Sequence, residues 1–184
     1  AEVARRALEA GAVIINDVSA LRFDPGLAAV AVAFDTPLML MHMLGDPGTM
    51  QADPHYDDVV ADIKSFLADA VARAVSLGIS RNRLVIDPGI GFGKTIGHNL
   101  SLIRHLSCFA DLDLPLLIGT SRKAFIRRTL ADDAARELAP QSPEVATGTQ
   151  ATVAAAILNG AHIVRVHDVA LTVATAKLMD AILA

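Results

Sequence analysis

The stretch "LVIDPGIGFGKT", residues Leu84 to Thr95, joins an apolar run to a glycine-rich turn and raises the question of what that turn binds. Its spelling suggests a nucleotide-binding loop. However, the phosphate-binding signature G-x-x-x-x-G-K-[ST] needs a glycine where Pro88 stands. The dinucleotide fingerprint G-x-G-x-x-G fails too, because its last glycine would fall on Lys94 or Ile96. We therefore interpret the stretch as a buried strand that ends in Asp87 and then turns sharply.

Four further apolar runs lie along the chain, and helical patterns separate them. The runs occupy residues 12–18, 37–43, 114–120 and 161–168 (AVIINDV, PLMLMHM, LPLLIGT and AHIVRVHD). Helices are expected over residues 1–10, 25–34, 57–77, 98–109, 121–130, 143–160 and 169–183. Short apolar strands that alternate with helices predict a parallel sheet built from βα units. The polar segment from Asp132 to Pro143 is expected to be an exposed loop.

The number of strands leaves two architectures to consider. Five strands alone fit an open doubly wound sheet, whereas a closed (β/α)8 barrel needs eight strands and about 250 residues. The chain, however, begins inside an amphipathic helical pattern, AEVARRALEA, without a cap or a methionine. We therefore predict an α/β fold, a (β/α)8 TIM barrel. Residues 1–184 would form one barrel domain that holds only the five carboxyl-terminal strands, with the amino-terminal strands absent.

Composition narrows the classes of partner and compartment. The net charge of −4 and the lack of a basic stripe argue against a nucleic-acid partner. No apolar run approaches the length of a membrane span, and no secretory signal opens the sequence, so we expect a protein without membrane association. The single cysteine, Cys108, lies in a helical pattern and is expected to be buried as a small apolar residue. With one cysteine no internal disulfide forms, which fits the cytoplasm.

Polar residues follow the apolar runs, where parallel strands deliver side chains to one rim. They are Asn16 with Asp17, His42, Asp87, Ser121-Arg122-Lys123, and Arg165 with His167. Ligands bind at this rim in barrels and in open parallel sheets. The pattern therefore predicts an active site at the carboxyl ends of the strands.

Asp87 and Phe92 each have a structural and a functional interpretation, and the residues alone leave the choice open. Asp87 is either a turn or capping aspartate, or a carboxylate that accepts paired hydrogen bonds from a flat nitrogen heterocycle. Phe92 lies between Gly91 and Gly93, which let a ligand approach closely. Its ring would pack either against an aromatic substrate or back onto the top of the barrel.

The cationic residues suit an anionic ligand. Arg165 and His167 are two residues apart on a strand, so they point to the same side and suit a di- or triphosphate. A purely structural arginine would need a carboxylate partner, which Asp168 could supply. Ser121 to Lys123 stand where a strand passes into a helix, a place that favours an anion, or else they are solvated cations. His42, between two methionines, is expected to be a core histidine. The histidine spacings predict no metal site built by this chain.

The motifs together resemble those of the dihydropteroate synthase family. They are IINDV, LMHM followed by GDPGTMQ, DPGIGFGKT with HN, GTSRK and AHIVRVHDV, in this order over essentially the whole chain. The resemblance implies a cytoplasmic (β/α)8 barrel enzyme, usually a homodimer, and a target of sulfonamides. Such an enzyme joins 4-aminobenzoate to 6-hydroxymethyl-7,8-dihydropterin pyrophosphate and releases pyrophosphate in folate biosynthesis.

The resemblance also implies residue roles. The pterin would be held by Asn16, Met41, Asp87, Gly119 and Lys123. The pyrophosphate would be bound, with Mg²⁺, by Arg165 and His167. The aminobenzoate would be bound by Phe92, Arg122, Lys123 and Ala124, where some members have a serine in place of Ala124. Catalysis would then rest on Asp87, Lys123, Arg165 and His167.

The family's first strand, with its metal-coordinating asparagine, and its third-strand pterin-binding aspartate do not occur in this sequence. The Mg²⁺ ligand is thus expected in an amino-terminal part outside these residues. Two alternatives remain: a catalytically incomplete fragment of such an enzyme, which we expect to be inactive alone, and a pterin-binding methyltetrahydrofolate methyltransferase. The second has no need of the anion sites at Ser121 to Lys123 and at Arg165 with His167.

Overall fold

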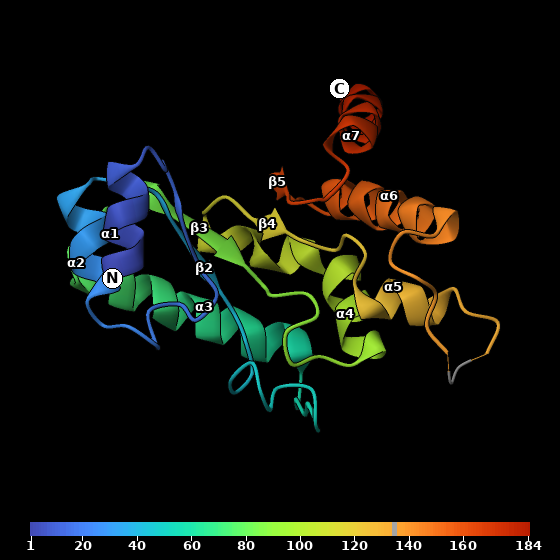
Figure 1. Ribbon diagram of the computed structural model, residues 1–184, viewed down its shortest axis with the longest axis horizontal. Coiled ribbons are helices and arrows are strands. Elements are labelled where there is room, and N and C mark those ends of the chain that lie inside the picture. Colours follow the sequence, from blue (N-terminus) through green and yellow to red (C-terminus); the bar gives the residue numbers. More distant parts are fainter. Residues whose placement is uncertain (134–135) are drawn as a thin grey trace.

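The computed structural model describes residues 1–133 and 136–184 as parallel strands that alternate with helices (Figure 1). The five expected strands are all present: β1 (Ile15–Asp17), β2 (Leu38–Met41), β3 (Leu84–Asp87), β4 (Leu117–Ile118) and β5 (Ile163–Val164). The α-helices are α1 (Glu2–Glu9), α2 (Leu27–Ala33), α3 (Val59–Ser76), α4 (Ile96–Arg104), α5 (Ala124–Thr129), α6 (Pro143–Leu158) and α7 (Val169–Leu183). Two 3-10 helices, η1 (Arg81–Arg83) and η2 (Leu106–Leu112), complete the described elements.

The strands follow one another in sequence order. β1, β2 and β3 pair in parallel, β4 pairs with β5, and a parallel bridge between Ile86 and Leu116 links the two sets. Consecutive parallel strands joined by helices are the repeating unit of a (β/α)8 barrel. The fold is therefore α/β, a partial TIM barrel, as predicted.

The pleat of the strands separates a covered face from an inner face. Ile15, Leu38 and Leu84 lie in register, and all three are buried in the core that the helices cover. Since side chains alternate across a strand, their neighbours Asn16 and Met39 lie on the opposite face. The inner face of the strands leads, at their carboxyl ends, to the predicted rim.

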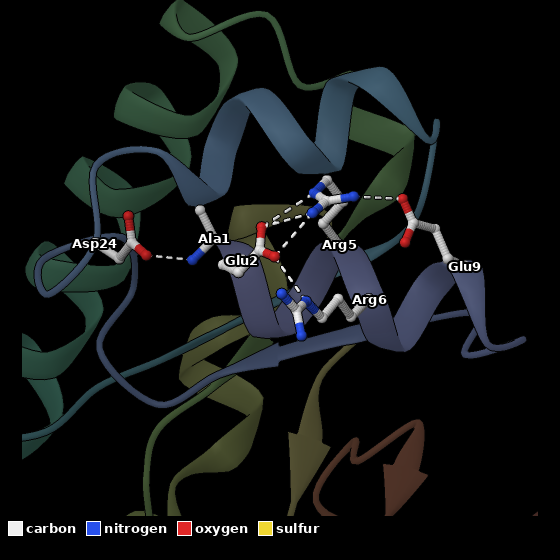
Figure 2. A network of polar contacts seen from close by, with 6 residues as sticks. All are labelled: Ala1, Glu2, Arg5, Arg6, Glu9 and Asp24. Carbon is white, nitrogen blue, oxygen red and sulfur yellow. Dashed lines mark hydrogen bonds and ion pairs between the residues drawn. The ribbon is translucent and has the colours of Figure 1, made fainter.

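Helix ends follow local capping chemistry. The Asp58 side chain accepts hydrogen bonds from the amides of Val60 and Ala61, which starts α3, and Ser142 caps α6 ahead of Pro143. On α1, Arg5 bridges Glu2 and Glu9, Arg6 also pairs with Glu2, and the amino group of Ala1 contacts Asp24 (Figure 2). These pairs lie at the surface and add little stability.

Two expectations for residues 98–109 were wrong. The single helix is interrupted at His105, whose Nδ1 lies 2.9 Å from the Ser101 carbonyl oxygen, and η2 follows. In η2, Leu106 and Phe109 are three residues apart, and both side chains are buried, because a 3-10 helix has three residues per turn. Cys108 is therefore exposed and not buried.

The remaining segments agree with the sequence in part. The expected loop from Asp132 to Pro143 has no helix or strand at the described positions before Pro143, which begins α6; residues 134 and 135 lie outside the described residues. α7 packs on α6 at the edge of the molecule (Figure 1). Several of its apolar side chains are exposed. Across the described residues, no helix combines the length and apolar character needed to cross a membrane.

Candidate active site

Asp87 ends β3 with its carboxylate fixed at the inner face. The residue is 1% exposed; its Oδ1 accepts a hydrogen bond of 2.7 Å from the Gly89 amide, and its Oδ2 lies 3.5 Å from Nη2 of Arg165. Burial raises the pKa of the carboxyl group, while the Gly89 hydrogen bond, Lys123, Arg165 and Lys94 oppose that rise. The result is a buried acceptor with one oxygen in the turn and the other directed toward a cation.

The turn after Asp87 requires glycine because it presses on β2. Gly89 has φ +71°, and a Cβ atom added there would lie 1.9 Å from the carbonyl oxygen of His42. The His42 amide donates to the Asp87 carbonyl at 2.9 Å, so the two strand ends are joined at this point. Without a side chain at Gly89, the chain can reverse directly above Asp87.

Lys123 links the glycine-rich turn to the inner face. Its Nζ donates to the Ile90 carbonyl oxygen and lies 4.8 Å from the centre of the Phe92 ring, a cation–π contact. Burial lowers the pKa of Lys123 to about 8, with Asp87 opposing and Arg165 adding to the decrease. The Phe92 ring is thus placed beside Lys123 at the rim.

Arg165 and His167 extend from the end of β5 toward the same region. A Cβ atom added at Gly119 would lie 3.3 Å from Nη2 of Arg165, so the missing side chain leaves room for the guanidinium. His167 Nδ1 lies 2.9 Å from Oγ of Ser121, and the His167 amide also donates to that oxygen. The predicted pair from one strand therefore meets the Ser121 turn.

Three cavities share these residues. A cavity of about 530 Å³ on the inner face is lined by residues including Asn16, Met39 and Arg165. A smaller one, of about 170 Å³, lies among Gly119, Ser121, Lys123, Arg165, Val166 and His167. The third, of about 740 Å³, includes Phe92, Lys123 and Ala124 in its lining. Arg165 lines the first two cavities and Lys123 the last two, whereas Asp87 lines none of the three.

Other predicted residues take different places. Met41 is fully buried and pairs in register with Asp87, so it lies at the back of the site. Arg122 lines none of the three cavities; its guanidinium lies 3.4 Å from Asp168. Asp168, considered as a structural partner for Arg165, therefore serves Arg122, and Asp87 is the carboxylate near Arg165.

Lys94 was not predicted as part of the site. It is 4% exposed, and its Nζ lies 3.0 Å from Nδ1 of His42 and donates to the Phe92 carbonyl oxygen at 3.0 Å. His42 is buried, as expected of a core histidine; burial, with Lys94 and Arg22, lowers its pKa to about 3. The only signal in the sequence was the position of a lysine directly after the glycines.

The side chains at the rim offer few oxygen ligands for Mg²⁺. The described residues hold no group of three or more His, Cys, Asp or Glu side chains able to bind a metal ion. Mg²⁺ is usually held by one or two carboxylates together with substrate phosphates. At this rim the buried carboxylate, Asp87, is already engaged by Gly89 and Arg165, so the residues present do not form a Mg²⁺ site.

Comparison with known proteins identifies the family of the chain. Residues 1–167 match the family described as "Pterin binding enzyme". The chain is 42% identical over 182 residues to dihydropteroate synthase of Synechocystis sp., covering 99% of this chain and 61% of that enzyme. The chain thus spans about three fifths of the length of that relative.

Solved structures show the same relationship. A dihydropteroate synthase from Stenotrophomonas maltophilia matches with a TM-score of 0.91 and 43% identity, covering 100% of this chain and 66% of that one. The enzyme from Xanthomonas albilineans with 4-aminobenzoic acid matches with a TM-score of 0.87 and 42% identity, over 100% and 62% of the two chains. The chain belongs to the pterin-binding enzyme family and is homologous to dihydropteroate synthases over its whole length.

Proposed function

We propose that the full-length protein condenses 4-aminobenzoate with 6-hydroxymethyl-7,8-dihydropterin pyrophosphate to give 7,8-dihydropteroate and pyrophosphate in folate biosynthesis. The observation that carries this proposal is the set of three cavities that share lining residues: Arg165 lines the cavity with Asn16 and the one with His167, and Lys123 lines the latter and the one with Phe92. Asp87 lines none of these cavities and lies behind them, 3.5 Å from Nη2 of Arg165. A related structure, from Xanthomonas albilineans, contains 7,8-dihydropteroate.

Each subsite has a chemical role in the proposal. Asp87 accepts hydrogen bonds from the pterin N–H groups, with Asn16, Met41, Gly119 and Lys123 around the ring. Arg165 and His167 bind the pyrophosphate, since a guanidinium binds phosphate oxygens bidentately. The aminobenzoate lies against Phe92 and Lys123, and its carboxylate lies near Ala124, where the backbone amide replaces a hydroxyl donor. Arg122 would reach this carboxylate only by leaving Asp168.

In the proposed reaction, charged side chains stabilise the charges that develop as the bond to pyrophosphate breaks. Arg165 and His167 stabilise the negative charge that builds on the departing pyrophosphate as the C–O bond to the pterin methylene breaks. The anionic Asp87 stabilises positive charge on the pterin, and the amine nitrogen of aminobenzoate forms the new C–N bond and then loses a proton. No covalent enzyme intermediate is required. A bound Mg²⁺ would neutralise further pyrophosphate charge, and we expect its protein ligand in an amino-terminal part of the full-length protein, since the described residues form no site for it.

The proposal also covers the domain, the complete barrel and the oligomeric state. Residues 1–184 form one pterin-binding domain, and further strands, which the longer relatives have room for, complete the barrel of a cytoplasmic homodimer. The methyltransferase alternative is disfavoured because it leaves the cavity between Lys123, Arg165 and His167 without a ligand. The fragment alternative applies to residues 1–184 alone and is compatible with a synthase as the full-length protein.

The test is product formation by the full-length protein from the two substrates. Lys123→Ala and Arg165→Ala should each lower kcat/KM by about 100-fold or more, as expected for lost transition-state charge stabilisation. Arg104→Ala, an exposed cation on α4, is the control and should keep wild-type turnover. Wild-type turnover in the Lys123 and Arg165 variants would remove both residues from the site, and absence of product from the wild type would refute the synthase proposal.

A further inference from the structure

The glycine-rich turn after β3 is held by side chains from the surrounding elements. The carbonyl oxygens of four consecutive residues, 90 to 93, each accept a hydrogen bond from a side chain. The donors are Lys123 for Ile90, Gln51 for Gly91 at 2.6 Å, Lys94 for Phe92 at 3.0 Å and Tyr56 for Gly93 at 2.8 Å. The Gly91 amide in turn donates to Oδ1 of Asn99 at 2.7 Å. The turn is therefore clamped from the β2–α3 loop, from α4 and from the start of α5.

These hydrogen bonds restrict the conformation of a segment that contains three glycines. Gly89, Gly91 and Gly93 all have positive φ, and glycine backbones lose more conformational freedom on folding than any other residue. Hydrogen bonds to the carbonyls select one conformation of the turn. They thereby fix the backbone that carries the Phe92 ring beside Lys123.

Lys94 is the most deeply buried of these donors. Its Nζ lies between the Phe92 carbonyl oxygen and Nδ1 of His42, which is itself packed edge-on against Phe66 with ring centres 4.8 Å apart. Tyr56 stacks edge-on against His98 and reaches the next carbonyl, that of Gly93. Both side chains hold the backbone of the turn through its carbonyl oxygens, and Phe92 and Lys94 both line the cavity of about 740 Å³.

We propose that Lys94 and Tyr56 are positioning residues for the second substrate. By holding the carbonyls of Phe92 and Gly93, they fix the Phe92 ring beside Lys123 and so preorganise the place where aminobenzoate binds. This inference rests on the proposed function, and it adds two residues that the sequence motifs assign no role. Their loss should affect the aminobenzoate subsite more than the pterin subsite, which is anchored by the separate Asp87 carboxylate.

The test compares three variants of the full-length protein. Lys94→Met removes both hydrogen bonds of the lysine, and Tyr56→Phe removes one hydroxyl without changing charge, so that the second variant isolates geometry from electrostatics. Lys64→Met, on the outer face of α3 where Lys64 pairs with Asp111, makes the same replacement away from the turn. Steady-state kinetics give KM for each substrate, and hydrogen exchange reports the amides of Gly91 and Phe92.

We expect Lys94→Met to raise KM for 4-aminobenzoate about ten-fold, since a lost internal hydrogen bond corresponds to roughly that factor. Tyr56→Phe should raise it a few-fold, KM for the pterin pyrophosphate should change less than about two-fold, and the Gly91 and Phe92 amides should exchange faster in both variants. Lys64→Met should change neither quantity.

The inference is overturned if both KM values rise equally, as in general destabilisation, or if the kinetics and amide exchange of both variants match the wild type. Should Lys94→Met fail to fold, Tyr56→Phe alone decides in the same way. If the wild type forms no product, the proposed function fails and the substrate role fails with it. The exchange data would then still show whether Lys94 and Tyr56 hold the turn.

Discussion

Asp87 combines features that no single contact explains. Its carboxylate is almost completely buried, yet three cations, Lys94, Lys123 and Arg165, lower its pKa against the effect of burial, and Nη2 of Arg165 lies 3.5 Å from its Oδ2. Each carboxylate oxygen can accept more than one hydrogen bond, so beyond the Gly89 amide and the Arg165 contact Asp87 keeps capacity for another donor. This explains how a structural position at a strand end can also serve as a ligand anchor.

Lys94 makes the stability of the fold depend on pH in a defined direction. Burial lowers the pKa of Lys94 to about 7, well below the ordinary lysine value of 10.5. Between these two values the unfolded chain binds more protons than the folded protein, so stability rises with pH. Relative to Lys94→Met, the free energy of unfolding of the wild type should therefore increase by up to about 1.4 kcal/mol per pH unit above pH 7.

Urea unfolding of both proteins at pH 7, 8 and 9 measures this difference. Lys64→Met serves as the control, since Lys64 is partly exposed and its curve should run parallel to that of the wild type. Parallel curves for Lys94→Met would mean that Lys94 remains charged in the folded protein at all three values.

The residues of the site were predictable to different degrees. Asp87, Arg165 and His167 could be predicted as rim residues because each lies at the end of an apolar run. The carboxyl ends of parallel strands meet at one rim in barrels of this kind. Lys94 was missed because its side chain turns inward from a loop, and loop geometry has no periodicity to reveal it. The partner of Arg165 was missed for a similar reason: Asp168 is adjacent in sequence, while Asp87 is adjacent in space.

At the scale of the element, the turn from Gly89 to Gly93 is restricted by sterics as well as hydrogen bonds. Gly89→Ala should destabilise the protein by about 3 kcal/mol or more, because the new methyl group meets the His42 carbonyl and the residue keeps a strained φ. Gly11→Ala is a matched control: Gly11 also has positive φ, but no atom lies within 4 Å of the added methyl group.

Chemical denaturation of the two variants separates strain from collision. Gly11→Ala should cost about 1 kcal/mol, the contribution of backbone strain alone. If Gly89→Ala costs no more than Gly11→Ala, the close approach of the turn to β2 does not persist in solution.

Secondary structure was predictable wherever periodicity was strong. All five strands and the long helices α3, α6 and α7 lie where the apolar pattern placed them. The break between α4 and η2 was not predicted, because the apolar residues Leu102, Leu106 and Phe109 recur after four and then three residues, a spacing that fits one continuous α-helix. The break falls at His105, whose backbone leaves the helical conformation and whose side chain contacts the Ser101 carbonyl.

At the scale of the whole molecule, the inner face of the sheet and the outer side of α7 are the least covered parts. The cavity of about 530 Å³ lies between the strands and α7, with Ile14, Leu117, Ile163 and Val173 in its lining. Further along α7, Leu178 and Ile182 are also exposed. In a closed barrel the interior is filled by side chains from all strands. The five strands described here provide only part of that filling.

We therefore expect residues 1–184, expressed alone, to form no dihydropteroate from 4-aminobenzoate and the pterin pyrophosphate above the level of an Asp87→Asn variant. The five strands leave the inner face open beside Arg165, and their residues form no Mg²⁺ site. Mixing this chain with the remaining amino-terminal part of a relative, or restoring that part in one polypeptide, should produce turnover. Robust product formation by the 184 residues alone would show that the partial barrel already contains a complete site.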